Sequence, residues 1–169
     1  MFARYFDLTI IEQPNPDVIT DRESAIQAAL FASGRPVLVV PYIHKAPLQL
    51  EQVLVAWGGS ATAARALGDA LPLLAKAKAI QVVSVVDGNA GPTGPRIVRH
   101  LEQHAITAKF HSLPGADDPT GALLSYAADC CADLLVMGGY GHSRFREFLL
   151  GGTTRSILAS MTLPVFMSH

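Results

Sequence analysis

From residue 52 onward, short apolar runs alternate with segments of helical periodicity, and this alternation leaves few folds open to the chain. The runs contain few charges, which is typical of strands buried on both faces of a parallel sheet. The strand-like runs are Gln52–Trp57, Gln81–Val86, Ala108–Ser112, Asp133–Met137 and Pro164–Met167. Their order with the intervening helices, β-α-β-α-β-α-β-α-β, predicts one complete doubly wound α/β domain over residues 52–169.

Helix-start signals follow two of these strands. Ser60, after Gly58 and Gly59, suits a helix N-cap better than a nucleophile, because no G-x-S-x-G elbow surrounds it. Asp118 followed by Pro119 predicts the start of a helix that runs to about Cys131.

The first part of the chain contains a partial repeat of the last part. Asp7–Ile11 resembles Asp133–Met137, and Pro36–Val39 resembles Pro164–Met167, with similar separations. Residues 1–41 are therefore predicted to form a β-α-β unit, and residues 42–51 a linker. The glycine loop that follows the first strand of the second copy is absent from the first copy, where Glu12–Pro16 stands instead.

The helix inside this N-terminal repeat has recognisable ends. Thr20 and Glu23 have the spacing of a capping box, and Gly34 suits the position just after the helix.

Composition excludes several classes of protein. Half of the residues are apolar, 16% are charged and the net charge is -1, which excludes disorder and makes nucleic acid an unsuitable partner. No apolar run reaches the roughly 18 residues of a membrane-spanning helix, and we do not expect residues 1–7 to act as a signal peptide, because they contain no long apolar stretch. The adjacent Cys130 and Cys131 suit neither a disulfide nor a zinc site. We therefore expect a cytoplasmic protein with no membrane partner and no metal centre built from its own residues.

A glycine-rich segment is the candidate ligand site. It runs from Gly138-Gly139-Tyr140-Gly141 to Gly151-Gly152-Thr153-Thr154, between a buried strand and a helix. Ligands bind at such strand ends in open α/β sheets, and glycine N–H groups at a helix start favour phosphate. No lysine stands where a P-loop would need one. The alternative is a tight connection that binds nothing.

The residues of this segment resemble the universal stress protein family. The family motif is G-x2-G-x9-G followed by Ser or Thr, and Gly138, Gly141 and Gly151 match its spacing. The preceding strand Asp133–Met137 and the ending Leu163-Pro164-Val165 are also similar. The resemblance covers residues 52–169 and interprets residues 1–41 as the tail of a first domain, as in tandem members.

The resemblance implies a fold, a ligand and a site. The fold is a flavodoxin-like, adenine nucleotide alpha hydrolase-like five-stranded sheet of order 3-2-1-4-5. The ligand is ATP or AMP, with Mg²⁺ if ATP is bound. The strand ends would border adenine and ribose, Met137, Gly138 and Gly141 would form the floor, and the start of the last helix would meet the phosphates. The implied binding residues are Ala56, Trp57, Gly58, Val85, Met137, Gly138, Gly141, Gly151, Gly152, Thr153 and Thr154.

Two positions depart from the family pattern. Members that bind ATP have Asp where this chain has Gly58, and Gly152 replaces the usual Ser or Thr. These departures favour an alternative function, a nucleotide-free dimerisation or adaptor protein of the same fold. A small hydrolase is a third possibility, but the sequence contains no catalytic constellation, so we expect a stress-response binding protein and not an enzyme.

The resemblance also implies assembly through strand edges. Two strands alone are marginal in water, so the N-terminal unit must dock. We expect Val37–Val40 to pair antiparallel with Val165–Met167, which leaves Leu8–Ile11 at the edge. A homodimer is therefore predicted, through the Val37–Val40 and Leu8–Ile11 strands or through Val165–Met167.

Overall fold

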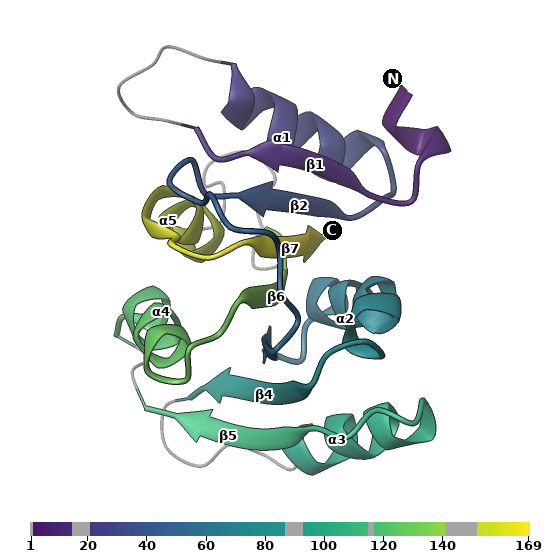
Figure 1. Cartoon of the computed structure of the whole chain (residues 1–169), viewed down its shortest axis with the longest axis vertical. Coiled ribbons are helices and arrows are strands. Elements are labelled where there is room, and N and C mark those ends of the chain that lie inside the picture. The colour runs from purple at the N-terminus through teal and green to yellow at the C-terminus, as the bar shows by residue number, and fades with distance from the viewer. Residues whose placement is uncertain (1, 15–20, 87–92, 115–116, 141–151) are drawn as a thin grey trace.

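Seven strands form one continuous sheet in the order β1-β2-β7-β6-β3-β4-β5 (Figure 1). The computed structural model describes residues 2–14, 21–86, 93–114, 117–140 and 152–169. The strands are β1 (Thr9–Glu12), β2 (Val37–Val40), β3 (Gln52–Ala56), β4 (Ala79–Val85), β5 (Lys109–Leu113), β6 (Leu134–Gly138) and β7 (Val165–Ser168). The helices are the short 3-10 helix η1 (Phe2–Tyr5), α1 (Arg22–Ala32), α2 (Ala61–Leu74), α3 (Thr93–Gln103), α4 (Pro119–Asp129) and α5 (Gly152–Ser160).

The five strands of residues 52–169 confirm the predicted flavodoxin-like order. Numbered within that region, the order β5-β4-β3-β6-β7 is 3-2-1-4-5, and every neighbouring pair is parallel. The complete sheet has two further strands, because the N-terminal repeat adds to it instead of forming a separate layer.

The N-terminal unit, which comprises β1, α1 and β2, joins the sheet through a single antiparallel pair. Val37 lies opposite Met167, Leu38 opposite Phe166 and Val39 opposite Val165. Strand β1 then pairs parallel with β2 and forms the outer edge. Strand β7 is hydrogen-bonded to β2 on one side and to β6 on the other, so both of its edges are paired within the chain.

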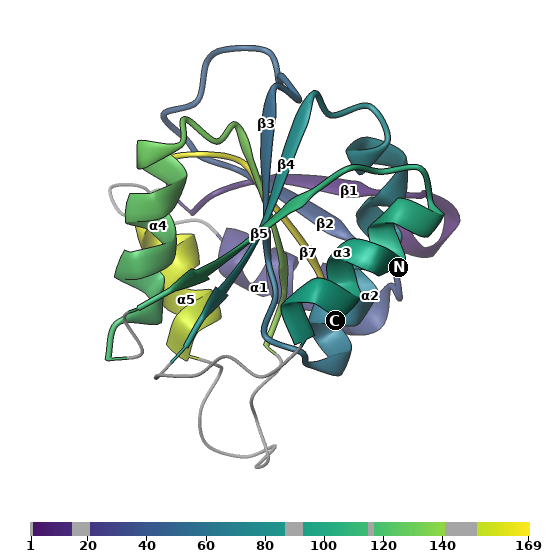
Figure 2. The same cartoon turned by 90° about the horizontal axis from the view of Figure 1, so that it is seen from below.

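Helices cover both faces of the sheet, as Figure 2 shows, with α4 and α5 on one side and α2 and α3 on the other. Strand residues alternate between two buried clusters, because successive side chains point to opposite faces. Val37, Val39 and Leu54 pack with α1, α4 and α5, whereas Leu38, Val53 and Val55 pack with α2 and α3.

The helix ends largely follow the sequence signals. Ser60 Oγ accepts a hydrogen bond from the Ala63 N–H, and an Asp118 carboxylate oxygen accepts one from the Gly121 N–H. Gly34 follows α1 with φ of 70°, as predicted. Helix α1 itself has Asp21 as N-cap without a side-chain bond, whereas Thr20 of the predicted capping box lies outside the described residues.

None of the helices in the described ranges is long and apolar enough to cross a membrane.

Candidate functional site: a cavity at the carboxyl ends of the parallel strands

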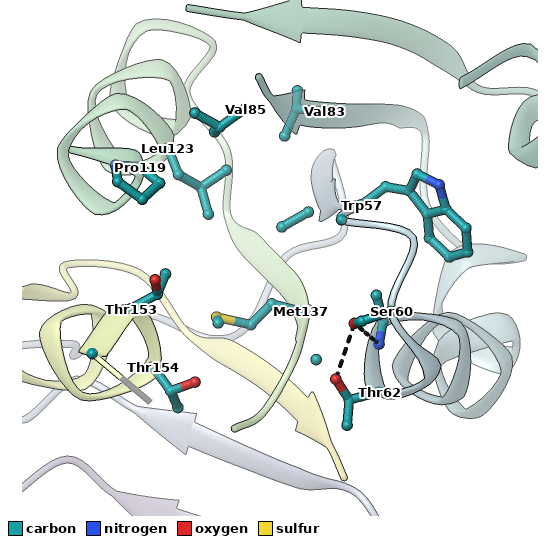
Figure 3. A pocket seen from close by; sticks show the side chains of 15 residues that line it. Trp57, Ser60, Thr62, Val83, Val85, Pro119, Leu123, Met137, Thr153 and Thr154 are labelled. Atoms are coloured by element: carbon teal, nitrogen blue, oxygen red, sulfur yellow. Dashed lines mark hydrogen bonds between the residues drawn. The ribbon is translucent and has the colours of Figure 1, made fainter. Parts of the chain in front are cut away.

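A cavity of about 370 Å³ opens where strands β3, β4 and β6 end (Figure 3). The first turns of helices α2, α4 and α5 complete its wall. The lining residues are Ala56, Trp57, Gly58, Ser60, Thr62, Ala63, Val83, Val85, Pro119, Leu123, Met137, Gly138, Gly152, Thr153 and Thr154. Its position is the one at which open α/β sheets bind ligands.

Every predicted site residue that the structure describes lines this cavity. The set is Ala56, Trp57, Gly58, Val85, Met137, Gly138, Gly152, Thr153 and Thr154. Gly141 and Gly151 lie outside the described residues.

Sequence reasoning missed six lining residues, namely Ser60 (identified only as a cap), Thr62, Ala63, Val83, Pro119 and Leu123. Two periodicities would have found some of them. Val83 shares a strand face with Val85, and Leu123 follows Pro119 by four residues on α4.

One part of the cavity wall is apolar. Val83, Val85, Leu123 and Met137 point into it from β4, α4 and β6 (Figure 3). Val83, Leu123 and Met137 belong to the buried core, so this wall is held by packing and not by a mobile segment. Such a surface suits a flat, weakly polar group such as a heterocyclic base.

The other part of the wall carries hydroxyl groups at two helix N-termini. Ser60 Oγ, the cap of α2, lies 3.1 Å from Thr62 Oγ1. Thr153 and Thr154 stand in the first turn of α5. Unpaired N–H groups and the helix dipoles make such ends attractive to anions. The described lining contains no ionisable side chain, so these dipoles and hydroxyls set its electrostatics.

Gly138 has a structural reason to be glycine besides the one that we predicted. A Cβ at this position would lie 2.6 Å from the main-chain nitrogen of Ala63 and 2.6 Å from Thr62 Oγ1. Strand β6 therefore ends directly against the first turn of α2. Because Gly138 has no side chain, the N-terminus of α2 can lie close enough to line the cavity, and this holds for any ligand.

Trp57 contributes main chain and not its ring to the wall. The indole points away from the cavity in Figure 3 and packs against the core on the α2 and α3 face. The Trp57 N–H donates to Val83 O at 2.7 Å, and the Trp57 carbonyl accepts from Ser84 Oγ. The predicted border at Trp57 is therefore made of backbone that is already hydrogen-bonded, and the ring cannot stack on a ligand from this position.

The Thr154 side chain is also engaged in a hydrogen bond within the protein. Its side chain is buried, and Oγ1 accepts a hydrogen bond of 3.0 Å from the Tyr140 N–H. The hydroxyl hydrogen remains as a donor. Thr153, which is half-buried, is the more accessible of the two predicted phosphate contacts.

Tyr140 itself has a perturbed phenol. Burial raises the pKa of Tyr140 and the Glu23 carboxylate raises it further, while a hydrogen bond from Gln27 and the charge of Arg155 act in the opposite direction.

The chain is similar to known proteins of one family. Residues 99–169 match the Universal stress protein family. A universal stress protein of Synechocystis sp. is 31% identical over 140 residues, which cover 78% of this chain and 46% of that protein. The chain therefore spans about half the length of the curated relative it matches.

Solved structures share the fold at low identity. A universal stress protein from Archaeoglobus fulgidus superposes with a TM-score of 0.72 at 20% identity, over 98% of this chain and 62% of that one. A universal stress protein in complex with cAMP has a TM-score of 0.52 at 20% identity, over 70% of this chain and 97% of that one. The solved structures share the fold, and the family match with the sequence relative identifies this chain as a member of the universal stress protein family.

Proposed function

We propose that the chain binds an adenine nucleotide, AMP or ATP, in the cavity at the strand ends. One observation carries the proposal: an apolar wall and two hydroxyl-bearing helix N-termini face the same space of about 370 Å³. This volume lies within the range of small-molecule pockets, about 300–1,000 Å³. The cAMP complex of a protein with this fold supports the same ligand class.

The two parts of the wall suggest how the nucleotide would lie. The base would pack against Val83, Val85 and Leu123, and the phosphate would approach Thr153 and the α5 N-terminus. Hydroxyl oxygens are weak ligands for Mg²⁺, and the described lining has no carboxylate. Mg²⁺ that arrives with ATP would therefore be held mainly by the phosphates and water.

The proposed role is binding and not catalysis. Among the lining residues that the structure describes, none is a carboxylate, imidazole or amine that would serve as a general base. Nucleotide binding then acts as a signal or a store in the stress response.

Titration calorimetry of the full chain tests the proposal, with AMP, ATP, adenosine and inorganic phosphate as probes. We expect AMP to bind more tightly than adenosine, because the helix N-termini add to the affinity for phosphate. Thr153→Ala should weaken AMP binding by about 1 kcal/mol, the contribution of one hydrogen bond. Thr120→Ala, on α4 outside the lining, is the matched control.

Gly58 favours one alternative function. It lies at the cavity rim and has no side chain of its own to hold a sugar hydroxyl. If none of the probes binds at millimolar concentration, the chain is a nucleotide-free adaptor of this fold.

We also propose that two copies associate through strand β1. No strand of the described residues pairs with its outer edge, and Ile10 is 65% exposed there. Phe2, Tyr5 and Phe6, just before the strand, are exposed as well. The opposite edge strand, β5, begins with Lys109, a residue that discourages edge pairing, whereas β1 offers isoleucine.

The sequence of β1 suits pairing with itself. In an antiparallel pair centred on Ile10, the two copies of this residue meet on one face, and Thr9 lies opposite Ile11 of the second copy. Leu8 then lies opposite Glu12, so no like charges oppose each other. A second copy would thus extend the sheet and cover the exposed isoleucine.

A further inference from the structure

Helix α1 of the N-terminal unit contacts the residues that follow strand β6. The Phe31 ring of α1 lies 5.1 Å from the Tyr140 ring and 4.6 Å from the His169 ring, measured between centroids. His169 Nδ1 is 3.0 Å from the Gly139 carbonyl oxygen, and the Gly139 N–H donates to Ser168 O at 2.8 Å. Three parts of the fold, α1, the end of β6 and the end of β7, therefore meet at Phe31.

Tyr140 connects this contact to the cavity. Its side chain is only 5% exposed, and its backbone has φ of 55°, a left-handed conformation that a tyrosine adopts only when its surroundings hold it. Its N–H donates to Thr154 Oγ1, and Thr154 lines the cavity. A continuous set of contacts thus runs from Phe31, which lies outside the lining, through Tyr140 to the cavity wall.

The N-terminal unit also holds both ends of helix α5. Glu23 of α1 forms an ion pair of 3.4 Å with Arg155 in the first turns of α5. Gln13, which is 2% exposed, donates from Nε2 to the Leu158 carbonyl at 2.7 Å near the other end. The ion pair is solvent-exposed and contributes little, but the buried Gln13 bond is costly to break.

We infer that the N-terminal unit positions the ligand site, because α1 holds Tyr140 in the conformation that orients Thr154 and the first turn of α5. Phe31 and Tyr140 are positioning residues and do not themselves line the cavity. For nucleotide affinity, this inference rests on the proposed function. Its structural part, the dependence of Tyr140 on Phe31, does not.

Coupling of this kind works in both directions. If docking of α1 favours the geometry that binds nucleotide, bound nucleotide must stabilise the docked α1 by the same free energy. A ligand in the cavity is therefore expected to slow amide exchange in α1 (Arg22–Ala32), although α1 contributes no residue to the lining.

The test compares three variants of the full chain. Phe31 is 46% exposed, so Phe31→Ala removes the ring contacts without leaving an enclosed hole in the core. We expect Phe31→Ala to weaken AMP binding by about fivefold or more, within the usual range of coupling between sites. Phe31→Tyr keeps the ring and should bind as the wild type does. Phe6→Ala, the same truncation at an exposed residue of the N-terminal segment, is the control.

A second readout needs no ligand. The Tyr140 amide, which donates to Thr154, should exchange faster in Phe31→Ala than in the wild type or Phe6→Ala, as measured by NMR on the unliganded proteins. If the wild type binds no AMP while this acceleration is seen, the proposed function fails and the positioning of Tyr140 stands. Exchange at Tyr140 that matches the wild type in Phe31→Ala would overturn the inference, with or without nucleotide binding.

Discussion

Gly138 ends strand β6 so close to helix α2 that a Cβ there would lie 2.6 Å from the main-chain nitrogen of Ala63. That nitrogen donates to Ser60 Oγ, and Ala63 is buried, so the first turn of α2 has little room to move. Gly138→Ala should lower the free energy of unfolding by about 1–3 kcal/mol, the usual cost of overpacking. Urea unfolding monitored by circular dichroism measures the change.

The control for this prediction is a glycine within helix α2. Gly68 lies within α2 with nothing within 4 Å of its Cβ position. Gly68→Ala should raise the free energy of unfolding by up to about 1 kcal/mol, because alanine favours helix. If both substitutions, Gly138→Ala and Gly68→Ala, destabilise the protein, the close approach of β6 to α2 is not the reason for the effect at Gly138.

A carboxylate at position 58 should strengthen nucleotide binding. A Cβ on Gly58 would meet no atom of the described residues within 4 Å, and Gly58 lines the cavity. Gly58→Asp should tighten AMP binding by about tenfold, the equivalent of one charge-assisted hydrogen bond to a sugar hydroxyl. Gly58→Ala, which adds bulk without an acceptor, is the control in the same titration. Equal affinity of the Asp and Ala variants would show that the sugar does not reach this rim.

A hydroxyl at position 152 should strengthen binding of the nucleotide phosphate. Gly152 is exposed as the first residue of α5, and no atom of the residues that the structure describes lies within 4 Å of its Cβ position. Gly152→Ser should increase the affinity for AMP by several fold, about 1 kcal/mol, while the affinity for adenosine stays constant. Gly68→Ser, also at an open helical glycine, should change neither. An equal gain for adenosine would place the new hydroxyl away from phosphate.

The Tyr140 phenol should make stability depend on alkaline pH. Because its pKa is raised by burial, the folded protein keeps the proton at pH values where the unfolded chain, with an ordinary pKa of about 10, loses it. This contribution to stability is complete below about pH 10 and is lost as pH rises through the folded value. Tyr140→Phe should therefore flatten the decline in unfolding free energy between about pH 9 and pH 11.

A lysine in the β1 edge should prevent self-association. Ile10→Lys replaces an exposed side chain, so folding should be unaffected, but two lysines would face each other in the proposed pair. Sedimentation velocity should show a dimer for the wild type and a monomer for Ile10→Lys. Ser112→Lys, at an exposed position of the opposite edge strand β5, should remain dimeric. A wild-type chain that is monomeric at all concentrations would refute the proposed assembly.

Most of the fold could be predicted because the local sequence preferences for strands and helix ends agree with the tertiary structure. Buried parallel strands are apolar along their length, so Gln52–Ala56 and Leu134–Gly138 were visible as strands in the sequence. The caps at Ser60 and Asp118 depend on side chains close in sequence and were equally visible. The antiparallel pairing of β2 with β7 was also predicted, and it is confirmed.

The site was only partly predictable, because several of its features depend on contacts between distant segments. The glycine spacing located the cavity, but nothing in the sequence gives the direction of the Trp57 ring, which the packing under α2 and α3 decides. The hydrogen bond from Tyr140 to Thr154 joins residues 14 positions apart in the sequence, and the buried bond from Gln13 joins the N-terminal unit to α5, so no local signal reveals either.

The antiparallel junction between β2 and β7 gives this single chain the symmetry of a dimer. In the internal repeat, Gln13 corresponds to Gly139 and Leu30 corresponds to Leu158. Gln13 donates to the Leu158 carbonyl, and a Cβ at Gly139 would lie 3.6 Å from Leu30, so equivalent positions in the two halves each contact the helix of the other half, although by different interactions. Only the second half retains the glycines. The chain therefore has two structurally related halves, but only the second half has the glycines of the proposed nucleotide site. We expect one nucleotide to bind per chain.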